Sequence, residues 1–155
     1  MKTLFLALTL ICGSYYKLPK DANVPIIVIE NKMNFSLKDV CFDGSKDYQN
    51  KKEAVIIIRH CKHVELTNIL VCNGAVGLLI DSCEDVTIAG LNAYDNDYGV
   101  IIYNSHHITL IDSVVGSGAL IDSHHNKILR IKGGFYLKNC HDDVLGDFKV
   151  LRAKE

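Results

Sequence analysis

A repeat of 22 residues runs through the middle of the chain and constrains the fold more than any other feature. Three segments of 13 residues align without gaps and start 22 residues apart, at Ala54, Val76 and Tyr98. A single unit of this size cannot bury an apolar face alone, so a fixed period predicts units that stack on one another.

Each repeat unit contains two short apolar segments separated by a polar turn. Alternation with period two is typical of strands, and it occurs at equivalent places in Val64–Leu66, Val86–Ile88 and Ile108–Leu110. Clusters of Asn, Asp, Gly and Ser recur where one unit ends, for example at Asn73-Gly74. We therefore predict an all-β right-handed parallel β-helix of about six coils of about 22 residues. A β-sandwich is the rival fold, but it requires no fixed register.

Less regular coils flank the three aligned ones. One begins near Ile29, a second near Ile121, and a last, partial coil near Leu137. With Ile121 aligned to Ile102, the last two coils are each expected to contain one extra residue in the polar turn.

Composition and the N-terminus bound the class of protein. The chain is 48% hydrophobic and 23% charged, with a net charge of -1 and no basic run, which argues against a nucleic-acid partner. Lys2 followed by the apolar residues 4–11 predicts a signal peptide over 1–14. A single β-helix domain with partial terminal coils would then occupy 15–155. We expect a secreted or extracytoplasmic protein without a transmembrane segment in the mature chain; the alternative is that the N-terminus forms a first buried strand.

The segment from Gly77 to Asn104 resembles the repeat of the pectin-lyase-like superfamily of parallel β-helices. It is similar to coils of pectate lyases, polygalacturonases, alginate epimerases, phage tailspikes and the periplasmic β-helix factor of nitrous oxide reductase maturation. The likeness covers residues 24–148 and is specific for fold. Activity in such proteins depends on sites placed on the fold, so the resemblance implies a function only by analogy.

Stacking converts equivalent positions into columns, and one column is expected to point outward from the isoleucines. Its predicted members are Glu30, Arg59, Asp81, Tyr103, Asp122 and Lys138. The resemblance implies that an acidic polysaccharide could lie along such a face. Asp81, Asp122 and Arg59 are the candidate catalytic residues, with the two carboxylates two coils apart, and Tyr103 and Lys138 are candidate substrate-binding residues. The alternative is a solvated face with cross-strand charge pairs.

A second column follows in the turn and contains small residues. Its predicted members are Cys61, Cys83, Ser105, His124 and Cys140. Buried thiols are the main interpretation, and a thiolate metal site is the alternative. Cys41 and Cys72 lie elsewhere in the coil, and pairing between them is left open.

All seven histidines are placed in this same turn by the repeat. They are His60, His63, His106, His107, His124, His125 and His141. Neutral imidazole is a common metal ligand, and His106, His107 and His125 are the candidate ligands. Calcium, zinc and copper are the candidate ions. The alternative is that a turn of this kind simply favours Asn, Asp or His.

Three functions follow from these patterns. The leading hypothesis is a secreted β-helix protein that binds or processes acidic polysaccharide or a cell-surface glycan, with catalysis itself left open. The second is a metal-binding module that uses the histidines. The third is a non-catalytic structural or adhesive solenoid, and the incomplete end coils also suggest an end-to-end homo-oligomer.

Overall fold

A computed structural model describes residues 14–19, 24–45, 54–146 and 148–151. Residues 1–13, which hold nearly all of the predicted signal peptide, lie outside the described part. The described residues form thirteen strands and no helix: β1 (Tyr15–Lys17), β2 (Ile27–Glu30), β3 (Met33–Asp43), β4 (Ala54–Arg59), β5 (Lys62–Cys72), β6 (Val76–Asp81), β7 (Glu84–Ala89), β8 (Asn92–Tyr94), β9 (Tyr98–Tyr103), β10 (His106–Ile121), β11 (Lys127–Lys138), β12 (Val144–Gly146) and β13 (Lys149–Leu151).

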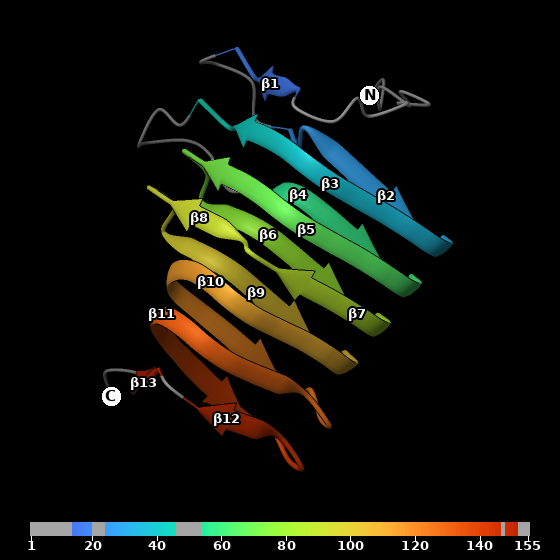
Figure 1. The fold of residues 1–155 in the computed structure, drawn as a ribbon, viewed down its shortest axis with the longest axis vertical. Helices are drawn as coiled ribbons and strands as arrows, with labels where there is room; N and C mark the ends of the chain where they lie inside the picture. The colour runs from blue at the N-terminus through green and yellow to red at the C-terminus, as the bar shows by residue number, and fades with distance from the viewer. Residues whose placement is uncertain (1–13, 20–23, 46–53, 147, 152–155) are drawn as a thin grey trace.

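Every pairing among these strands is parallel, and the strands stack as successive coils (Figure 1). One stack runs β2, β4, β6, β9 and the last parts of β10 and β11. A second runs β3, β5, β7, the first parts of β10 and β11, and β12. A shorter third stack begins with β1 and includes β8. The predicted parallel β-helix is thereby confirmed.

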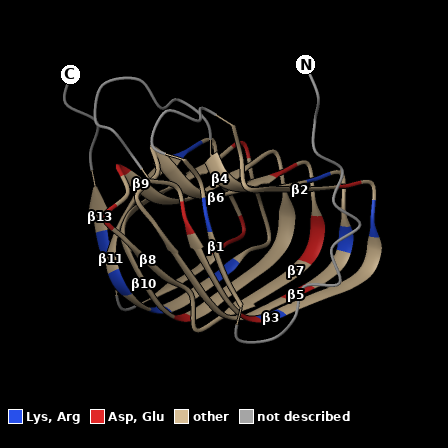
Figure 2. Cartoon of the chain, turned by 90° about the horizontal axis from the view of Figure 1, so that it is seen from above, with Lys and Arg blue, Asp and Glu red and all other residues tan. Residues whose placement is uncertain are grey.

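The coils enclose one interior, seen along the stack in Figure 2. Ile58, Ile80 and Ile102 are register partners and are fully buried. In the second stack, Val86 pairs with Ile108 and Ile88 pairs with Leu110, and all four residues are also 0% exposed. Full burial of such a side chain contributes about 1.5–3 kcal/mol, so the repeated aliphatic columns are the main stabilising feature.

The turn between the first and second stacks has the same backbone in every coil. Two columns of residues have a positive φ of 46–55°: Asn31, His60, Ser82, Asn104, Asp122 and Asn139, and then Asn34, His63, Asp85, His107, His125 and Asp142. Asn, Asp and His accept this left-handed conformation better than most residues. The backbone therefore accounts for His60, His63, His107 and His125, as the alternative interpretation of the histidines stated. His106, His124 and His141 lie outside the two columns.

The expected register of the last coils is wrong. Leu120, and not Ile121, pairs with Ile102, and Leu137 pairs with Leu120, so the period falls from 22 to 18 and then 17 residues. The polar turn keeps its length. The coil loses residues at another corner, where β10 continues through an irregularity between Val114 and Gly116, with Gly116 at a φ of 66°. A glycine permits this tight passage because it has no Cβ.

Candidate functional site

Five histidines line one corner of the stack, and we call this set the histidine edge: His106, His107, His124, His125 and His141. Parallel bridges join His106 to His124 and His124 to His141. The imidazoles of these three residues stack, with ring centroids 5.1 and 5.0 Å apart and interplanar angles of 12° and 24°. The parallel register of the coils therefore sets the spacing of the rings.

Adjacent histidines within one coil approach even more closely. The Nδ1 atoms of His106 and His107 are 3.1 Å apart, and those of His124 and His125 are 2.7 Å apart. Neighbouring side chains of a regular strand point to opposite faces. The positive φ of the second histidine interrupts that alternation, so both imidazoles of each pair are presented at the surface with their rings nearly perpendicular.

Glu84 completes a three-residue cluster with His106 and His107. It is the register partner of His106 on the preceding coil. One ligand atom each of Glu84, His106 and His107 can be chosen so that all lie within 4.8 Å of one another. A hydrogen bond from Lys62, whose Nζ lies 2.9 Å from Oε2, lowers the pKa of Glu84 and keeps it anionic near neutral pH.

A carboxylate also lies near the pair formed by His124 and His125. Oδ2 of Asp142 is 3.9 Å from Nε2 of both His125 and His141. Partial burial, followed by the charges of the surrounding imidazoles, lowers the pKa of His124. The neutral imidazole, which is the form that binds metals, is therefore favoured at His124.

The candidate ligands predicted from sequence are only partly brought together. His106 and His107 form one close pair, whereas His125 belongs to the pair on the next coil. Glu84 was missed, although the 22-residue spacing from His106 could have indicated it. His63 lies outside the histidine edge and pairs with Asp85 at 3.2 Å. The assignment of a metal to these residues stays a prediction.

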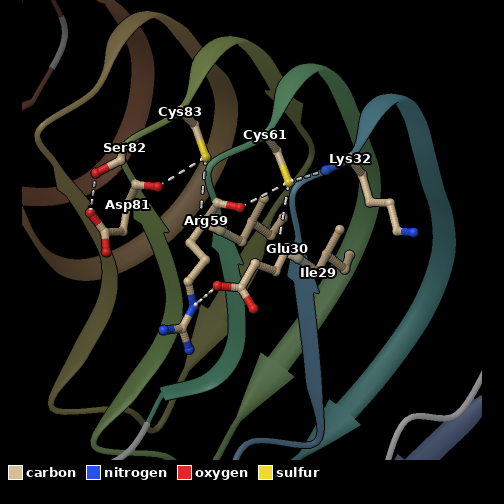
Figure 3. A network of polar contacts seen from close by, with 9 residues as sticks. Ile29, Glu30, Lys32, Arg59, Cys61, Asp81, Ser82 and Cys83 are labelled. Atoms are coloured by element: carbon tan, nitrogen blue, oxygen red, sulfur yellow. Dashed lines mark hydrogen bonds and ion pairs between the residues drawn. The ribbon is translucent and has the colours of Figure 1, made fainter.

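The cysteine column consists of buried thiols in its central part. Sγ of Cys61 and Cys83 lies 3.2 Å from the backbone oxygens of Arg59 and Asp81, respectively (Figure 3). Burial raises the pKa of Cys83 to about 11, which keeps it a thiol and a poor metal ligand at neutral pH. The column contains Ser123 and not His124, because His124 is the register partner of His106; the Ser105 amide accordingly donates a hydrogen bond to the Ser123 hydroxyl. The five described cysteines are free, including Cys41 and Cys72.

The predicted outward-pointing column is present on the first stack in the coils that keep the 22-residue period. Arg59, Asp81 and Tyr103 are successive register partners, and Nε of Arg59 lies 3.8 Å from Glu30 (Figure 3). Asp122 is not in this strip; its place is taken by Ile121, which precedes Lys138 in the column. The placement of Asp122 was wrong because the register shift moves it into the turn, where its φ is 49°.

The two predicted catalytic carboxylates have separate local partners. Asp81 accepts a hydrogen bond from the Ser82 hydroxyl at 2.8 Å, and Asp122 accepts one from the Asn139 amide at 2.8 Å. Two open depressions of the described surface lie beside other residues. One has a volume of about 360 Å³ and is bordered by His141, Asp142 and Asp143, and the other is bordered by His63 and Asp85. The catalytic roles of Arg59, Asp81 and Asp122 and the substrate-binding roles of Tyr103 and Lys138 stay predictions.

The comparisons with curated sequences and with solved structures carry no functional argument. No curated protein sequence matches it significantly. Among solved structures, a trypsin-treated variant of QnrB1, a plasmid-mediated fluoroquinolone resistance protein, aligns at a TM-score of 0.45 and 9% identity, covering 83% of this chain and 73% of QnrB1. A second trypsin-treated QnrB1 variant has a TM-score of 0.28, 12% identity and 90% coverage of both chains. Similarities at this level carry no functional argument.

The family match covers most of the chain. Residues 21–150 match the family described as periplasmic copper-binding protein (NosD). The periplasmic description agrees with the extracytoplasmic location predicted from the N-terminal sequence. In the described part of the chain, no helix is long and apolar enough to cross a membrane. On the strength of the match over residues 21–150, this chain belongs to the NosD family of periplasmic copper-binding proteins.

Proposed function

We propose that the protein binds a copper ion outside the cytoplasm through His106, His107 and Glu84. The observation that carries the proposal is the 3.1 Å separation of the Nδ1 atoms of His106 and His107, with a carboxylate of the preceding coil in reach. The copper-binding description of the family supports the choice of ion.

The donor atoms fit copper well. Two nitrogens bonded to one metal at about 2.0–2.1 Å and at right angles are about 2.9 Å apart, close to the separation seen here. Tetragonal sites of nitrogen and oxygen donors are typical of copper(II) or nickel(II), whereas calcium takes oxygen ligands only. Two imidazoles and one carboxylate therefore favour copper over calcium, and zinc remains a competitor to be tested.

The location of the cluster suits reversible binding. His107 is exposed, and His106 and Glu84 are half-buried. Three protein ligands at a surface leave coordination positions for water or for a ligand from another molecule. When bound, copper would supply a Lewis-acidic, redox-active centre. The chain's own contribution is to hold two imidazoles and one carboxylate in a fixed arrangement.

The polysaccharide function has weaker support. Its predicted strip lies outside the two depressions described above, and the register separates Asp122 from the column that contains Asp81. A hydrolytic mechanism would need the two carboxylates on opposite sides of one bond.

Copper titration of the purified protein tests the proposal directly. The double variant His106→Gln, His107→Asn should bind copper(II) on the order of 100-fold more weakly at this site. Asn retains tolerance of the positive φ at position 107, so the backbone is preserved. The matched control is His60→Asn, which removes an exposed histidine of the same turn that lies outside the cluster. Equal affinity of wild type and the double variant would reject the proposal.

A further inference from the structure

We infer that the outward face of the first stack is the interface of a homodimer, in which two copies of the chain pack face to face with their coils in opposite order. The inference goes beyond copper binding, because this face contains none of His106, His107 and Glu84. It assigns a partner to a surface that the proposed function does not use.

An apolar column runs along the outward side of the first stack. Each coil contributes one residue, and the members are successive register partners: Val28, Ile57, Leu79, Ile101, Ala119, Tyr136 and Leu151. None of them is part of the cluster of side chains that fills the interior. Ile57, for example, lies between the inward-pointing Ile56 and Ile58. Val28 and Leu79 are half-buried, so the column is partly open to solvent. An unbroken apolar column on an outer face indicates a surface that is covered by a partner.

The equivalent outward column of the second stack is different. Its register partners are polar or charged in five successive coils: Ser36, Glu65, Thr87, Thr109 and Lys127. This is the alternation expected of a strand with one face in water. The apolar column is therefore a specific property of the first stack and not of the fold.

Tyrosines extend the apolar surface over the later coils. The rings of Tyr98 and Tyr136 meet edge to face, with centroids 6.2 Å apart, although their strands β9 and β11 are two coils apart. The coil between them contributes the small Ala119 to the column. Tyr98 is 37% exposed, and Tyr103 is 43% exposed. Tyrosine is enriched at protein interfaces because it offers a large apolar ring together with a hydroxyl group.

The neighbouring column, two residues later in each strand, decides how two copies are oriented. In coil order it contains Glu30, Arg59, Asp81, Tyr103, Ile121 and Lys138. A twofold axis along the strands, between Asp81 and Tyr103, reverses the coil order of the second copy and keeps each column opposite itself. Glu30 then faces Lys138 of the second copy, and Asp81 faces the hydroxyl of its Tyr103. Each contact occurs twice, and both are electrostatically complementary.

The same arrangement matches the sizes of the apolar side chains. The facing pairs across the interface are Ile57 with Ala119, Leu79 with Ile101, and Val28 with Tyr136. Arg59 faces an apolar residue, but its Nε atom keeps Glu30 of its own chain at 3.8 Å. Small residues opposite large ones allow two sheet faces to interdigitate.

The alternative twofold axis, along the stack, fits less well. With the apolar column on that axis, the charged column would face the column two residues before the apolar one. Its members in three successive coils are uncharged: Val55, Gly77 and Gly99. Charge complementarity therefore favours the opposite coil order.

The experiment is sedimentation equilibrium of the purified protein over roughly 1–500 μM, because a face two columns wide is at the small end of interfaces and predicts a micromolar Kd. A chelator is present throughout, so that copper cannot bridge two chains. Wild type is expected to show a monomer–dimer equilibrium. Leu79→Lys should raise Kd on the order of 100-fold, since it places an unpaired charge at the centre of the interface. The matched control is Thr87→Lys, which adds the same charge to the outward face of the second stack and should leave Kd unchanged.

Charge reversal tests the opposite coil order. Glu30→Lys and Lys138→Glu should each raise Kd on the order of tenfold, and the double variant should return it towards the wild-type value. Within one chain the two residues are five coils apart, about 24 Å, so such a rescue requires contact between copies. Circular dichroism checks that every variant retains its β structure.

Four outcomes would overturn the inference. They are a wild type that stays monomeric over the whole range, a dimer that Leu79→Lys leaves intact, charge reversals that do not rescue each other, and association that continues beyond the dimer. The last would indicate end-to-end stacking of the coils. Copper affinity is measured separately, so each of these results leaves the proposed function untouched.

Discussion

At the scale of single residues, the backbone of one turn explains why histidine is accepted at positions 107 and 125. Two positions in each coil have a positive φ, and His107 and His125 occupy the second of them. L-residues with a Cβ pay about 1–2 kcal/mol in this conformation, and β-branched residues are the least tolerant. The histidines of these positions therefore have a structural role that is separate from any metal.

Substitution at position 107 can separate the structural role from the metal-binding role. His107→Val should lower the free energy of unfolding by about 1–2 kcal/mol, because a β-branched residue is strained at a φ of 55°. His107→Asn should change it by less than about 0.5 kcal/mol. Urea denaturation in the presence of a chelator measures both. Equal destabilisation by the two variants would contradict the backbone explanation.

At the scale of elements, side chains from one coil satisfy backbone amides of the coil before it. The Cys83 amide donates to the Ser105 hydroxyl at 3.0 Å, and the Ser105 amide donates to the Ser123 hydroxyl at 3.1 Å. The Ile108 amide donates to Asn126 Oδ1 at 2.9 Å. Buried amides at a turn lack a strand partner, so these acceptors replace the ladder where the chain bends.

Removal of one such acceptor should be costly. Ser123 is 0% exposed, and its hydroxyl is the partner of the buried Ser105 amide. Ser123→Ala is expected to destabilise the protein by about 1–3 kcal/mol, since the amide would be left unsatisfied. The matched control is Ser36→Ala on an exposed position of β3, expected to be nearly neutral. A loss below about 0.5 kcal/mol at Ser123 would show that water reaches the amide.

The attachment of β1 to β3 should depend on pH. Burial alone would raise the pKa of Asp43, but hydrogen bonds from Asn73, Tyr15, the Ser45 amide and Lys17 outweigh it and lower the pKa to about 2. A depressed carboxyl pKa stabilises the folded state above the unfolded value near 3.8, and this contribution is lost as pH falls towards 2. Unfolding free energies should therefore fall more steeply between pH 4 and 2 in wild type than in Asp43→Asn. Parallel curves would argue against the depressed pKa.

At the scale of the whole molecule, stability comes from contacts between successive coils. Each coil contacts mainly its two neighbours, as the strand pairing shows. A central coil therefore contributes two interfaces and a terminal coil one. A substitution in a central coil should therefore weaken the interfaces with both of its neighbours.

The isoleucine column provides the test of this view. Ile80 is fully buried between Ile58 and Ile102, so Ile80→Ala should cost about 2–5 kcal/mol. Leu145 on the last described coil is 37% exposed, and Leu145→Ala should cost much less. Denaturant titrations of both variants give the comparison. Similar losses would mean that the two coils are coupled more widely than nearest-neighbour stacking allows.

The sequence by itself determined the parallel β-helix and the columns of its regular coils. Where the period stays at 22, positions such as Arg59, Asp81 and Tyr103 can be aligned by counting, because parallel hydrogen bonding holds equivalent residues side by side. The gathering of the histidines in one turn was visible for the same reason. The preference of that turn for Asn, Asp and His was also readable from residue type.

Only the tertiary structure decided the register after the third aligned coil and the partners of the histidines. A shortened coil can lose residues at any corner, and the sequence does not show at which corner. The loss occurs near Gly116. As a result, Ile121 takes the column position predicted for Asp122, and Ser123 takes the one predicted for His124. The approach of Glu84 to His106 and His107 and the close Nδ1 pairs depend on side-chain directions set by the positive φ of the turn. Register and side-chain direction arise from packing between coils, and that packing exists only in the folded chain.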